Sequence, residues 1–281
     1  MATIGLIHLV WAPLGLEPFA DFVRAYKGHP AGIDHALVIL FKAFASPAAL
    51  RPYYDLLAGV AYTPLLLPDV GIDLLPYFRA ADQVDCPYLC FLNSYSRIQD
   101  ADWLAKLHAQ VVQPGVGLVG ATASYESHYS SSVRFLVPRK TRTRLRGWII
   151  SYWRHRQIRQ AQAAFDPFPN YHIRSNTFML ARDLMRTLEF RGERLKADSL
   201  RFEAGKWGMT RQILARGLQP QVVGRDGQAY AKEQWYESGT FRSGAQANLL
   251  VADNRTEQYR TADSPTRRLL AEMAWGPRAA E

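Results

Sequence analysis

Two groups of polar residues directly follow apolar runs, and their types and spacing suit the binding of a polar ligand. The first group, in "LLLPDVGID", contains Asp69, Gly71 and Asp73. The carboxylates can accept hydrogen bonds from a ribose or from an imide of the uracil type, and the glycine allows a tight turn. Alternatively, Asp69 begins a turn and Asp73 caps a helix. The stretch therefore predicts either a nucleoside site or an ordinary turn and cap.

The second group follows the apolar run in "CPYLCFLNSYSR" and contains Asn93, Ser94, Ser96 and Arg97. A guanidinium can bind phosphate oxygens through two parallel hydrogen bonds, so we expect this tip to face a phosphate. Hard divalent cations prefer carboxylate oxygen, and the tip offers none before Asp100. A metal ion is therefore either held elsewhere or not needed. A plain polar loop is the structural alternative.

The elements that must position these residues alternate between strands and helices up to residue 124. Apolar runs predict strands at 3–13, 35–44, 62–71, 87–93 and 116–124, and helical periodicity predicts helices at 16–26, 51–61, 71–84 and 100–112. Short connections and this alternation predict an α/β fold with a mostly parallel sheet and helices on both faces. Ligands bind such sheets at the carboxyl ends of the strands, where both polar groups lie.

The later part of the chain is less regular. We expect a strand over 170–182, a helix within 200–218, a strand and turn over 219–230 and a final helix around 264–275. On the expected strand, His172, Arg174 and Asn176 occupy alternate positions and would share one face. A solvated face of an edge strand is the alternative.

The totals fit one large continuous domain that falls into three parts: 1–126, 127–165 and 166–281 of the 281 residues. With 48% hydrophobic and 21% charged residues, the chain can build a sizeable core. No apolar run approaches the roughly 18 residues of a membrane-spanning helix, and the first residues read as a strand rather than a signal peptide. Cys86 and Cys90 are expected to be buried free thiols, which suits a reducing cytoplasm.

The middle part carries the whole charge surplus. Lysine and arginine exceed aspartate and glutamate by 34 to 25, a net charge of +9. Between Glu126 and Asp166 there is no acid but nine bases, namely Arg134, Arg139, Lys140, Arg142, Arg144, Arg146, Arg154, Arg156 and Arg159. Because tryptophan, tyrosine and isoleucine are interleaved with them, the segment suits an anionic membrane surface, a nucleic acid or a pyrophosphate-linked lipid. A solvated helix face is the structural alternative.

The order of these blocks resembles the rhamnan-synthesis F-type proteins, glycosyltransferases with the GT-A fold. "LPDVGIDLLPYF" is similar to that family's block Pro-Asn-x-Gly-x-Asp-x-x-Pro-Phe, with Asp69 in place of the usual Asn. A strand with a polar tip, a helix beginning near Trp103 and a Gly-Leu-Val strand follow in the family's order. Asn93-Ser94 replaces the usual His-Ser or His-Thr. The resemblance covers 35–125 well and extends more weakly to residue 220.

The resemblance implies a GT-A-like, or Rossmann-like, fold with a nucleotide sugar as the donor. The donor site would then comprise Asp69, Gly71, Asp73, Asn93, Ser94, Ser96 and Arg97. The Asp-x-Asp by which metal-dependent GT-A enzymes bind Mn²⁺ or Mg²⁺ is missing from the tip after the fourth strand, so weak or absent metal dependence is expected. A late loop after "NLLV" would close on the diphosphate through Asp253, Asn254 and Arg255.

On the acceptor side, Glu203 in "RFEAGKWGMTRQILARGL" resembles the acidic helix start of GT-A enzymes, where a carboxylate takes the acceptor proton. Ala204 replaces the second acid, so Asp198 is an alternative base, and a mere preference for a helix N-terminus is the structural alternative. GT-A enzymes often bind the acceptor on the preceding strand, which here carries His172, Arg174 and Asn176. We expect His8 and His172 to be ordinary hydrogen-bonded histidines rather than metal ligands.

The leading hypothesis is a hexosyl- or deoxyhexosyltransferase of polysaccharide biosynthesis. It would move a sugar from a UDP-, GDP- or dTDP-linked donor to a cell-surface glycan or lipid-linked saccharide, in the cytoplasm or at the inner face of the membrane. The alternatives are a non-enzymatic nucleic-acid- or membrane-binding protein that uses 134–159, and a catalytically inactive GT-A scaffold. A Gly-x-Gly-x-x-Gly at 115–120 lies within the fifth strand, which argues against a dinucleotide enzyme, and neither a P-loop nor a Gly-x-Ser-x-Gly elbow occurs.

Overall fold

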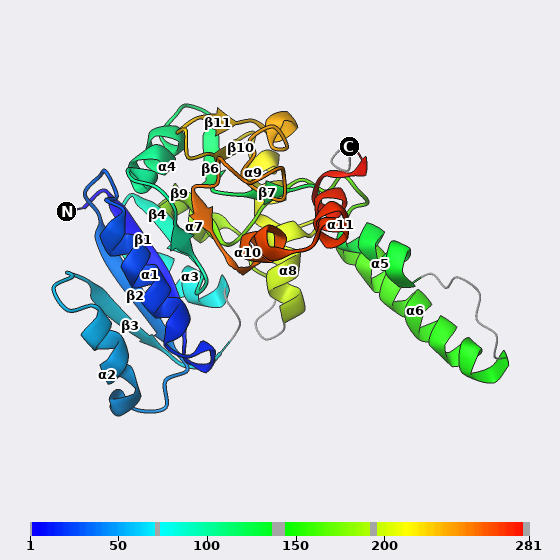
Figure 1. The fold of residues 1–281 in the computed structure, drawn as a ribbon, viewed down its shortest axis with the longest axis horizontal. Helices are drawn as coiled ribbons and strands as arrows, with labels where there is room; N and C mark the ends of the chain where they lie inside the picture. The colour runs from blue at the N-terminus through cyan, green and yellow to red at the C-terminus, as the bar shows by residue number, and fades with distance from the viewer. Residues whose placement is uncertain (1, 71–73, 137–143, 192–195, 278–281) are drawn as a thin grey trace.

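The structure, a computed structural model, describes residues 2–70, 74–136, 144–191 and 196–277 (Figure 1). Its centre is an eight-stranded sheet in the order β11-β10-β6-β9-β4-β1-β2-β3. The strands are β1 (Ile4–Trp11), β2 (Ala36–Lys42), β3 (Thr63–Leu67), β4 (Tyr88–Leu92), β6 (Val116–Gly120), β9 (Thr177–Ala181), β10 (Gln219–Val223) and β11 (Ala229–Tyr230).

Most neighbouring strands in this sheet run parallel. β1 pairs in parallel with β2 and β4, β2 with β3, and β6 with β10. β9 lies antiparallel between β4 and β6, and β11 lies antiparallel to β10. The predicted α/β class with a mostly parallel sheet is therefore confirmed.

Helices cover both faces of the sheet, as predicted. One face packs against α1 (Glu17–Gly28), α2 (Pro47–Leu56) and α4 (Trp103–Val111), and the other against α3 (Leu74–Gln83), α7 (Arg182–Thr187), α8 (Lys196–Ala204) and α9 (Met209–Ala215). Successive strand side chains point to opposite faces, so the neighbours Ile39 and Leu40 are both fully buried but belong to different apolar clusters. This two-sided burial explains why the strands read as continuous apolar runs.

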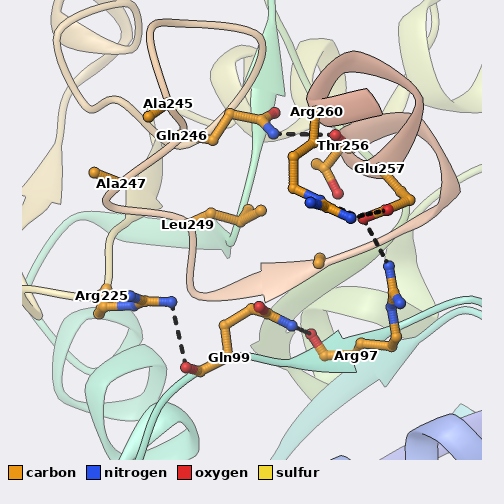
Figure 2. A pocket seen from close by; sticks show the side chains of 11 residues that line it. Arg97, Gln99, Arg225, Ala245, Gln246, Ala247, Leu249, Thr256, Glu257 and Arg260 are labelled. Carbon is orange, nitrogen blue, oxygen red and sulfur yellow. Dashed lines mark hydrogen bonds and ion pairs between the residues drawn. The ribbon is translucent and has the colours of Figure 1, made fainter. Parts of the chain in front are cut away.

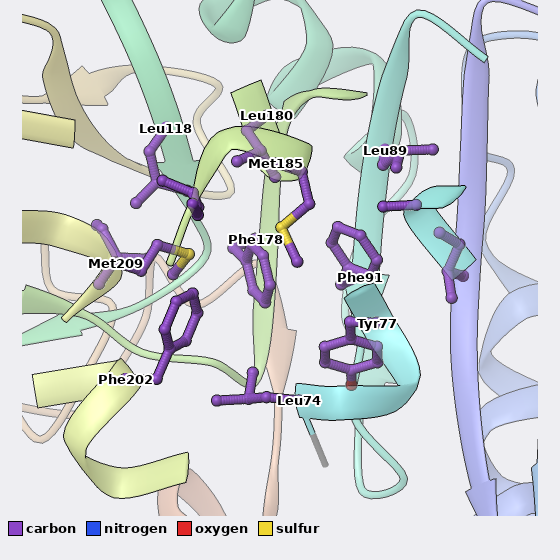
Figure 3. Packing of buried hydrophobic residues seen from close by; sticks show 14 of the residues in the cluster. Leu74, Tyr77, Leu89, Phe91, Leu118, Phe178, Leu180, Met185, Phe202 and Met209 are labelled. Atoms are coloured by element: carbon purple, nitrogen blue, oxygen red, sulfur yellow. The ribbon is translucent and has the colours of Figure 1, made fainter. Parts of the chain in front are cut away.

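Figure 3 shows the cluster on the α3 side of the sheet. The ring of Tyr77 lies 4.8 Å from that of Phe91, which lies 4.9 Å from that of Phe178 on the next strand. Phe202 of α8 enters the same cluster beside Met209. Packing of this kind fixes α8 against the sheet.

Two short ladders tie later segments to the carboxyl ends of the central strands. β5 (Arg97–Ile98) pairs with β12 (Val251–Ala252), and β7 (Ala123–Ser124) pairs with β8 (His172–Ile173). After β12 the chain forms α10 (Asn254–Thr261) and α11 (Ser264–Trp275), and two short 3-10 helices span Ala12–Leu14 and Lys232–Gln234.

Several predicted elements were wrong in detail, among them the strand expected over 116–124, which is divided into β6 and β7, and the helix expected over 51–61, which is α2 at 47–56. The strand expected over 170–182 is two strands, because β8 pairs with β7 whereas β9 inserts between β4 and β6, and a turn at 175–176 connects them. The helix expected within 200–218 is divided into α8 and α9. The helix expected over 100–112 begins only at Trp103, directly after Asp102, and Asp100 lies before it and pairs with Lys106 at 2.7 Å.

The Gly-x-Gly-x-x-Gly of 115–120 has a packing role. A Cβ at Gly117 would approach Leu218 to 2.8 Å, and a Cβ at Gly120 would collide with Ile173. Both glycines lie in β6, so this motif allows close approach of neighbouring segments rather than phosphate binding at a helix start. This placement within β6 agrees with the prediction that the motif does not bind a dinucleotide.

The basic middle part forms two helices, α5 (His128–Leu136) and α6 (Arg144–Ala164), that extend away from the rest of the molecule (Figure 1). The 21 residues of α6 make a helix about 30 Å long. Its base is held by a hydrogen bond from the Ser127 hydroxyl to the Asp166 carbonyl, by contact of the His128 and Phe165 rings, and by a bond from the Lys206 N–H to the Ala164 carbonyl.

Candidate active site

The turn at 174–176 joins three groups of predicted site residues. It follows β8 and precedes β9, so it lies beside the tip that follows β4. Arg174 reaches the loop before α10, Ser175 reaches α8, and Asn176 reaches the tip after β4. Residues that the sequence places far apart therefore meet around one short segment.

Ser175 binds the carboxylate of Glu203. Its backbone N–H donates to Glu203 Oε2 at 2.7 Å, and its hydroxyl donates to the same oxygen. Both of these bonds end on Oε2, and Glu203 is partly exposed, so Oε1 is the oxygen that can face another group. The interpretation of Glu203 as a helix start was wrong, because it lies in the last turn of α8, next to Ala204.

The position of Glu203 follows from its neighbours in the chain. Phe202 is buried, and its ring lies 5.4 Å from that of Phe78 and 5.5 Å from that of Phe190. The Ala204 carbonyl accepts a hydrogen bond of 2.7 Å from the side-chain amide of Asn170. Glu203 is thus fixed from both sides, as a catalytic carboxylate would have to be.

Electrostatics keep Glu203 ionised. Burial by itself raises the pKa of Glu203, but the nearby His172 and Arg174 and the two hydrogen bonds from Ser175 outweigh burial and lower it. Burial lowers the pKa of His172, whose Nδ1 contacts the Asn170 carbonyl at 2.8 Å. His172 is therefore a buried side chain near the carboxylate of Glu203. As expected, it has a hydrogen-bond partner, the Asn170 carbonyl.

Arg174 is the buried cation of the site. It donates to Asp253 Oδ2 at 2.7 Å and to the Thr122 hydroxyl at 3.2 Å, and its guanidinium lies 4.2 Å from the ring centre of Phe241. Asp253 in turn caps α10 by accepting from the N–H groups of Arg255 and Thr256. These contacts outweigh burial and lower the pKa of Asp253.

Arg242 is a site residue that our sequence reasoning missed. It is buried and pairs with Glu126 at 3.2 Å. Its guanidinium lies 4.9 Å from the centre of the Phe241 ring, which Arg174 also contacts. The pKa of Arg242 is lowered to about 10, mainly by burial and in addition by the charges of Arg174 and Arg255, while the charges of Glu126 and Asp253 act in the opposite direction. The only signal in the sequence was an isolated arginine in the loop "ESGTFRSGAQ", and loops of this kind often carry function.

The charges of Arg174 and Arg255 both act on Arg242, and Glu126 and Asp253 are the acids that oppose them. Glu203 is a third acid of this region, because the charge of Arg174 lowers its pKa. Three positive charges thus meet three negative ones. Asn254 and Arg255, the first residues of α10, are exposed, so Arg255 is the cation of these three that an added anion can reach directly.

The tip after β4 is held to the 174–176 turn. The Asn93 N–H and the Ser96 hydroxyl each contact the Asn176 carbonyl at 3.0 Å, and Asn93 Oδ1 accepts from the Tyr95 N–H at 3.0 Å. Ser94 and Ser96 are both buried, so Ser96 supports the tip from inside. Of the three predicted residues Asn93, Ser94 and Ser96, Asn93 is the one that is partly exposed.

Asn176 carries an unpartnered donor. Its Oδ1 accepts from the Thr122 hydroxyl at 2.6 Å, while its Nδ2 is buried with no hydrogen-bond partner among the described residues. Arg242 Nε is likewise buried without a hydrogen-bond partner among the described residues. Buried donors are normally satisfied, and two of them in one small region indicate a place where a further acceptor belongs.

Arg97 lies apart from this cluster. Figure 2 shows it lining a cavity of about 390 Å³ with Arg225, Gln246 and Arg260, where Arg97 and Arg260 both bind Glu257. The Arg97–Glu257 contact measures 3.0 Å. Arg97 therefore faces the β5–β12 side rather than the 174–176 turn.

Asp69, the described residue of the group predicted to bind the donor after β3, lies at the carboxyl ends of β2 and β3. Asp69 is 58% exposed and pairs at 3.1 Å with Lys42, a buried residue at the end of β2. Gly71 and Asp73 lie outside the described residues. The structure therefore places one of these three residues, Asp69, at the carboxyl ends of β2 and β3.

Asp198 does not share the position of Glu203. It lies in the first turn of α8 and binds Arg201 at 3.1 Å. Five residues along a helix correspond to a rotation of about 140°, so the two carboxylates point to different sides of α8. The geometry favours Glu203 as the base.

A divalent metal does not fit the described residues. Among them, no group of three or more His, Cys, Asp or Glu side chains is arranged to hold an ion. The tip after β4 offers Asn93 and Ser94 where carboxylates would be needed. His8, also considered as a ligand, is fully buried and stacks on Phe22 at 3.6 Å; contrary to expectation, neither of its ring nitrogens has a hydrogen-bond partner in the described structure.

The searches of known protein families and of characterised proteins gave no match. Among solved structures, the mannosyltransferase PcManGT from Pyrobaculum calidifontis, in complex with GDP-Man and Mn²⁺, has a TM-score of 0.49 and 13% identity, over 85% of this chain and 60% of that chain. Mouse xyloside xylosyltransferase 1 in its apo form has a TM-score of 0.37 and 11% identity, over 66% of this chain and 69% of that chain.

Residues 1–349 of TarS from S. aureus, in complex with UDP-GlcNAc, have a TM-score of 0.31 and 11% identity, over 42% of this chain and 33% of that chain. At these values the likenesses say nothing about the activity of the chain, which spans 60% of the length of the mannosyltransferase. A separate finding concerns membranes: within the described ranges, every helix is too short or too polar to cross a bilayer.

Proposed function

We propose that this chain is a GT-A-type glycosyltransferase that moves a sugar from a nucleotide-sugar donor to a hydroxyl group of a saccharide acceptor. One observation carries the proposal. The turn at 174–176 connects the candidate base Glu203, the polar tip at Asn93 and the arginine–aspartate loop at Asp253. A base, a sugar-facing tip and an anion-binding loop are the three parts that glycosyl transfer needs.

In the proposed reaction, the acceptor hydroxyl oxygen forms a bond to the anomeric carbon of the donor sugar. The bond from that carbon to the diphosphate oxygen breaks, and its electron pair leaves with the nucleoside diphosphate. Glu203 takes the acceptor proton through Oε1, while Ser175 holds Oε2. The lowered pKa of Glu203 means that the carboxylate is ionised and ready to accept that proton at neutral pH.

The leaving diphosphate needs positive charge or hydrogen-bond donors. The cluster of Arg174, Arg242 and Arg255 would supply both, with the exposed Arg255 as the cation that an incoming diphosphate can reach directly. The unpartnered Nδ2 of Asn176 adds a donor that a phosphate or sugar oxygen would satisfy. Because the described residues do not fit a divalent ion, we expect these groups to stabilise the leaving group with little or no help from Mn²⁺ or Mg²⁺.

The polar residues at the ends of β3 and β4 would bind the other parts of the donor. Asp69, with Gly71 and Asp73, would hold the nucleoside. Asn93 would line the diphosphate side, where the buried Ser94 and Ser96 support the tip. Arg97, which binds Glu257 on the β5–β12 side, would reach the diphosphate only by leaving that contact. His172 stands beside Glu203 and would contact the acceptor. We propose a hexose or deoxyhexose as the transferred sugar and a cell-surface glycan or lipid-linked saccharide, met at the inner face of a membrane, as the acceptor of a polysaccharide-forming reaction.

Calorimetric titration of the protein with UDP, GDP and dTDP, with and without Mn²⁺, tests the donor site directly. We expect saturable binding of one nucleotide, largely independent of the metal. Absence of binding for all three would contradict the proposal. Binding of a nucleotide sugar without either transfer or hydrolysis of the sugar would instead identify an inactive scaffold.

A further inference from the structure

The helical hairpin of α5 and α6 presents an unusual surface. It extends from the rest of the molecule, so much of it faces solvent (Figure 1). From 127 to 165 the chain has nine bases and no acid, whereas the remaining residues contain 25 bases and 25 acids. A helix that only had to be soluble would usually mix both signs of charge.

Large aromatic side chains on this hairpin are exposed rather than buried. Tyr152 is 62%, Trp153 54% and Phe135 56% exposed. The Tyr152 and Trp153 rings are 6.3 Å apart, and the Arg156 guanidinium lies 5.6 Å from the Trp153 ring. Tyrosine and tryptophan have an apolar body and a polar end, which suits the boundary between lipid tails and headgroups.

The exposed aromatics and bases share one side of α6. Residues three, four or seven positions apart lie along the same stripe of a helix. Arg156 is therefore next to both Tyr152 and Trp153, and Arg159 continues the stripe by one turn. All four side chains are exposed.

We propose that the hairpin docks this chain on an anionic lipid bilayer, with Tyr152 and Trp153 among the headgroups and Arg156 and Arg159 on lipid phosphates. A nucleic-acid duplex would also attract the bases, but it would leave the exposed indole and phenol without a favourable environment. The inference deepens the proposed function by naming the surface that would bring the site to its acceptor. Its test measures binding only, so it can fail while the transferase proposal stands.

Flotation with lipid vesicles tests the proposal on the full chain. We expect the protein to float with vesicles of equal parts phosphatidylcholine and phosphatidylglycerol, to float poorly with pure phosphatidylcholine, and to be released by salt. Each base near the surface contributes about fivefold, so replacing the exposed Arg156 and Arg159 together with the partly exposed Arg154 of the same helix by Gln should weaken binding about a hundredfold. Replacing Tyr152 and Trp153 by Ser should weaken it about tenfold through lost apolar contact.

A matched variant separates local from overall charge. Arg24, Arg51 and Arg268 are also exposed but lie on other helices. Changing these three to Gln removes the same charge and should leave vesicle binding near the wild-type value. An equal loss in both triple variants would overturn the proposal, as would equal binding to neutral vesicles.

Single-stranded polyuridylate, tested at the same ionic strength, separates the two kinds of polyanion. Tighter binding to this RNA than to the anionic vesicles, lost in the arginine variant, would overturn the proposal and identify a nucleic-acid surface. Circular dichroism of each variant confirms that a loss of binding reflects the changed side chains rather than an unfolded chain.

Discussion

The two ends of the sheet are held together in different ways. In the amino-terminal part, from β1 to β4, the contacts are mostly apolar, and the ion pairs have an exposed partner: Arg24 of the pair Arg24–Asp21 is 77% exposed, and Asp69, which pairs with the buried Lys42, is 58% exposed. Around the candidate site the ion pairs are buried: the side chains of Arg174 and Asp253 are 10% and 1% exposed. The first part is built for packing, and the second keeps charges inside at a considerable energetic cost.

This contrast shows where function is to be sought. Buried charges persist only where other groups satisfy them, so their concentration around 174–176 marks the part of the molecule that serves more than stability. Apart from the buried His8 in β1, the strands of the amino-terminal part carry their polar groups at or just beyond their ends, as at Lys42 and Asp69. We therefore expect substitutions in the two parts to affect different measured quantities.

The largest effect is expected from Glu203→Gln. The amide keeps the shape of the side chain but cannot take a proton, so the transfer rate should fall about 10²- to 10⁴-fold while the dissociation constant of the donor stays near its wild-type value. Asp69→Asn, in the amino-terminal part, should instead weaken donor binding and leave the rate at saturation little changed. Steady-state kinetics and calorimetry of both variants separate these outcomes.

A wild-type transfer rate in Glu203→Gln would show that Glu203 is not the catalytic base. Asp198→Asn then becomes the deciding variant, because Asp198 is the other acid of α8. A loss of rate in Asp198→Asn alone would show that the acceptor lies on the opposite side of that helix.

The amino-terminal part was also the part that the sequence predicted well. Its strands are apolar runs and its helices have clear periodicity, so local pattern alone locates β4 and α3 to within a few residues. The polar tips at Asp69 and Asn93 follow from the same pattern, because parallel strands place their ends on one edge.

The carboxyl-terminal part could not be predicted in this way, because its contacts join distant positions. Arg174 and Asp253 are 79 positions apart, and Arg242 and Glu126 are 116 apart. No local pattern indicates such partners. The division of 170–182 into β8 and β9 likewise depends on which strands each half pairs with.

The second prediction tests the energetic side of the contrast. Arg174→Met leaves Asp253 as an uncompensated buried charge, so the free energy of unfolding should fall by about 3–5 kcal/mol. Arg24→Met removes the exposed ion pair with Asp21 and should cost no more than about 1 kcal/mol. Urea denaturation at neutral pH measures both. Equal losses in the two variants would show that the buried pair has no special role.

The third prediction concerns the one buried histidine of the amino-terminal strands. Burial lowers the pKa of His8 from 6.5 to about 3. Below pH 6.5 the unfolded chain therefore binds a proton that the folded chain refuses, and stability falls by about 1.4 kcal/mol per pH unit until the folded group also titrates. At pH 5 the loss from His8 amounts to ~2 kcal/mol.

His8→Phe should remove this part of the pH dependence, because phenylalanine can occupy the stack on Phe22 without titrating. Urea denaturation at neutral and mildly acidic pH measures the difference. An unchanged slope in His8→Phe would show that the acid sensitivity arises elsewhere, for instance at the polar cluster.

The smallest effect is expected from Ser96→Ala. Ser96 is fully buried, and its hydroxyl contacts Asn93 Oδ1 and the Asn176 carbonyl at 3.0 Å each, so its removal should cost about 1 kcal/mol of stability. Ser46→Ala, which removes the cap of α2 in the amino-terminal part, should cost about the same.

The two serine variants differ in what else they disturb. Because Ser96 fixes the tip against the 174–176 turn, its loss should also lower the transfer rate several-fold, while Ser46→Ala leaves the rate unchanged. Transfer rates measured at saturating donor compare the two variants directly, because both are expected to lose about the same stability. If Ser96→Ala weakened donor binding without changing that rate, Ser96 would contact the donor itself, and the buried side of the tip would have to open during catalysis.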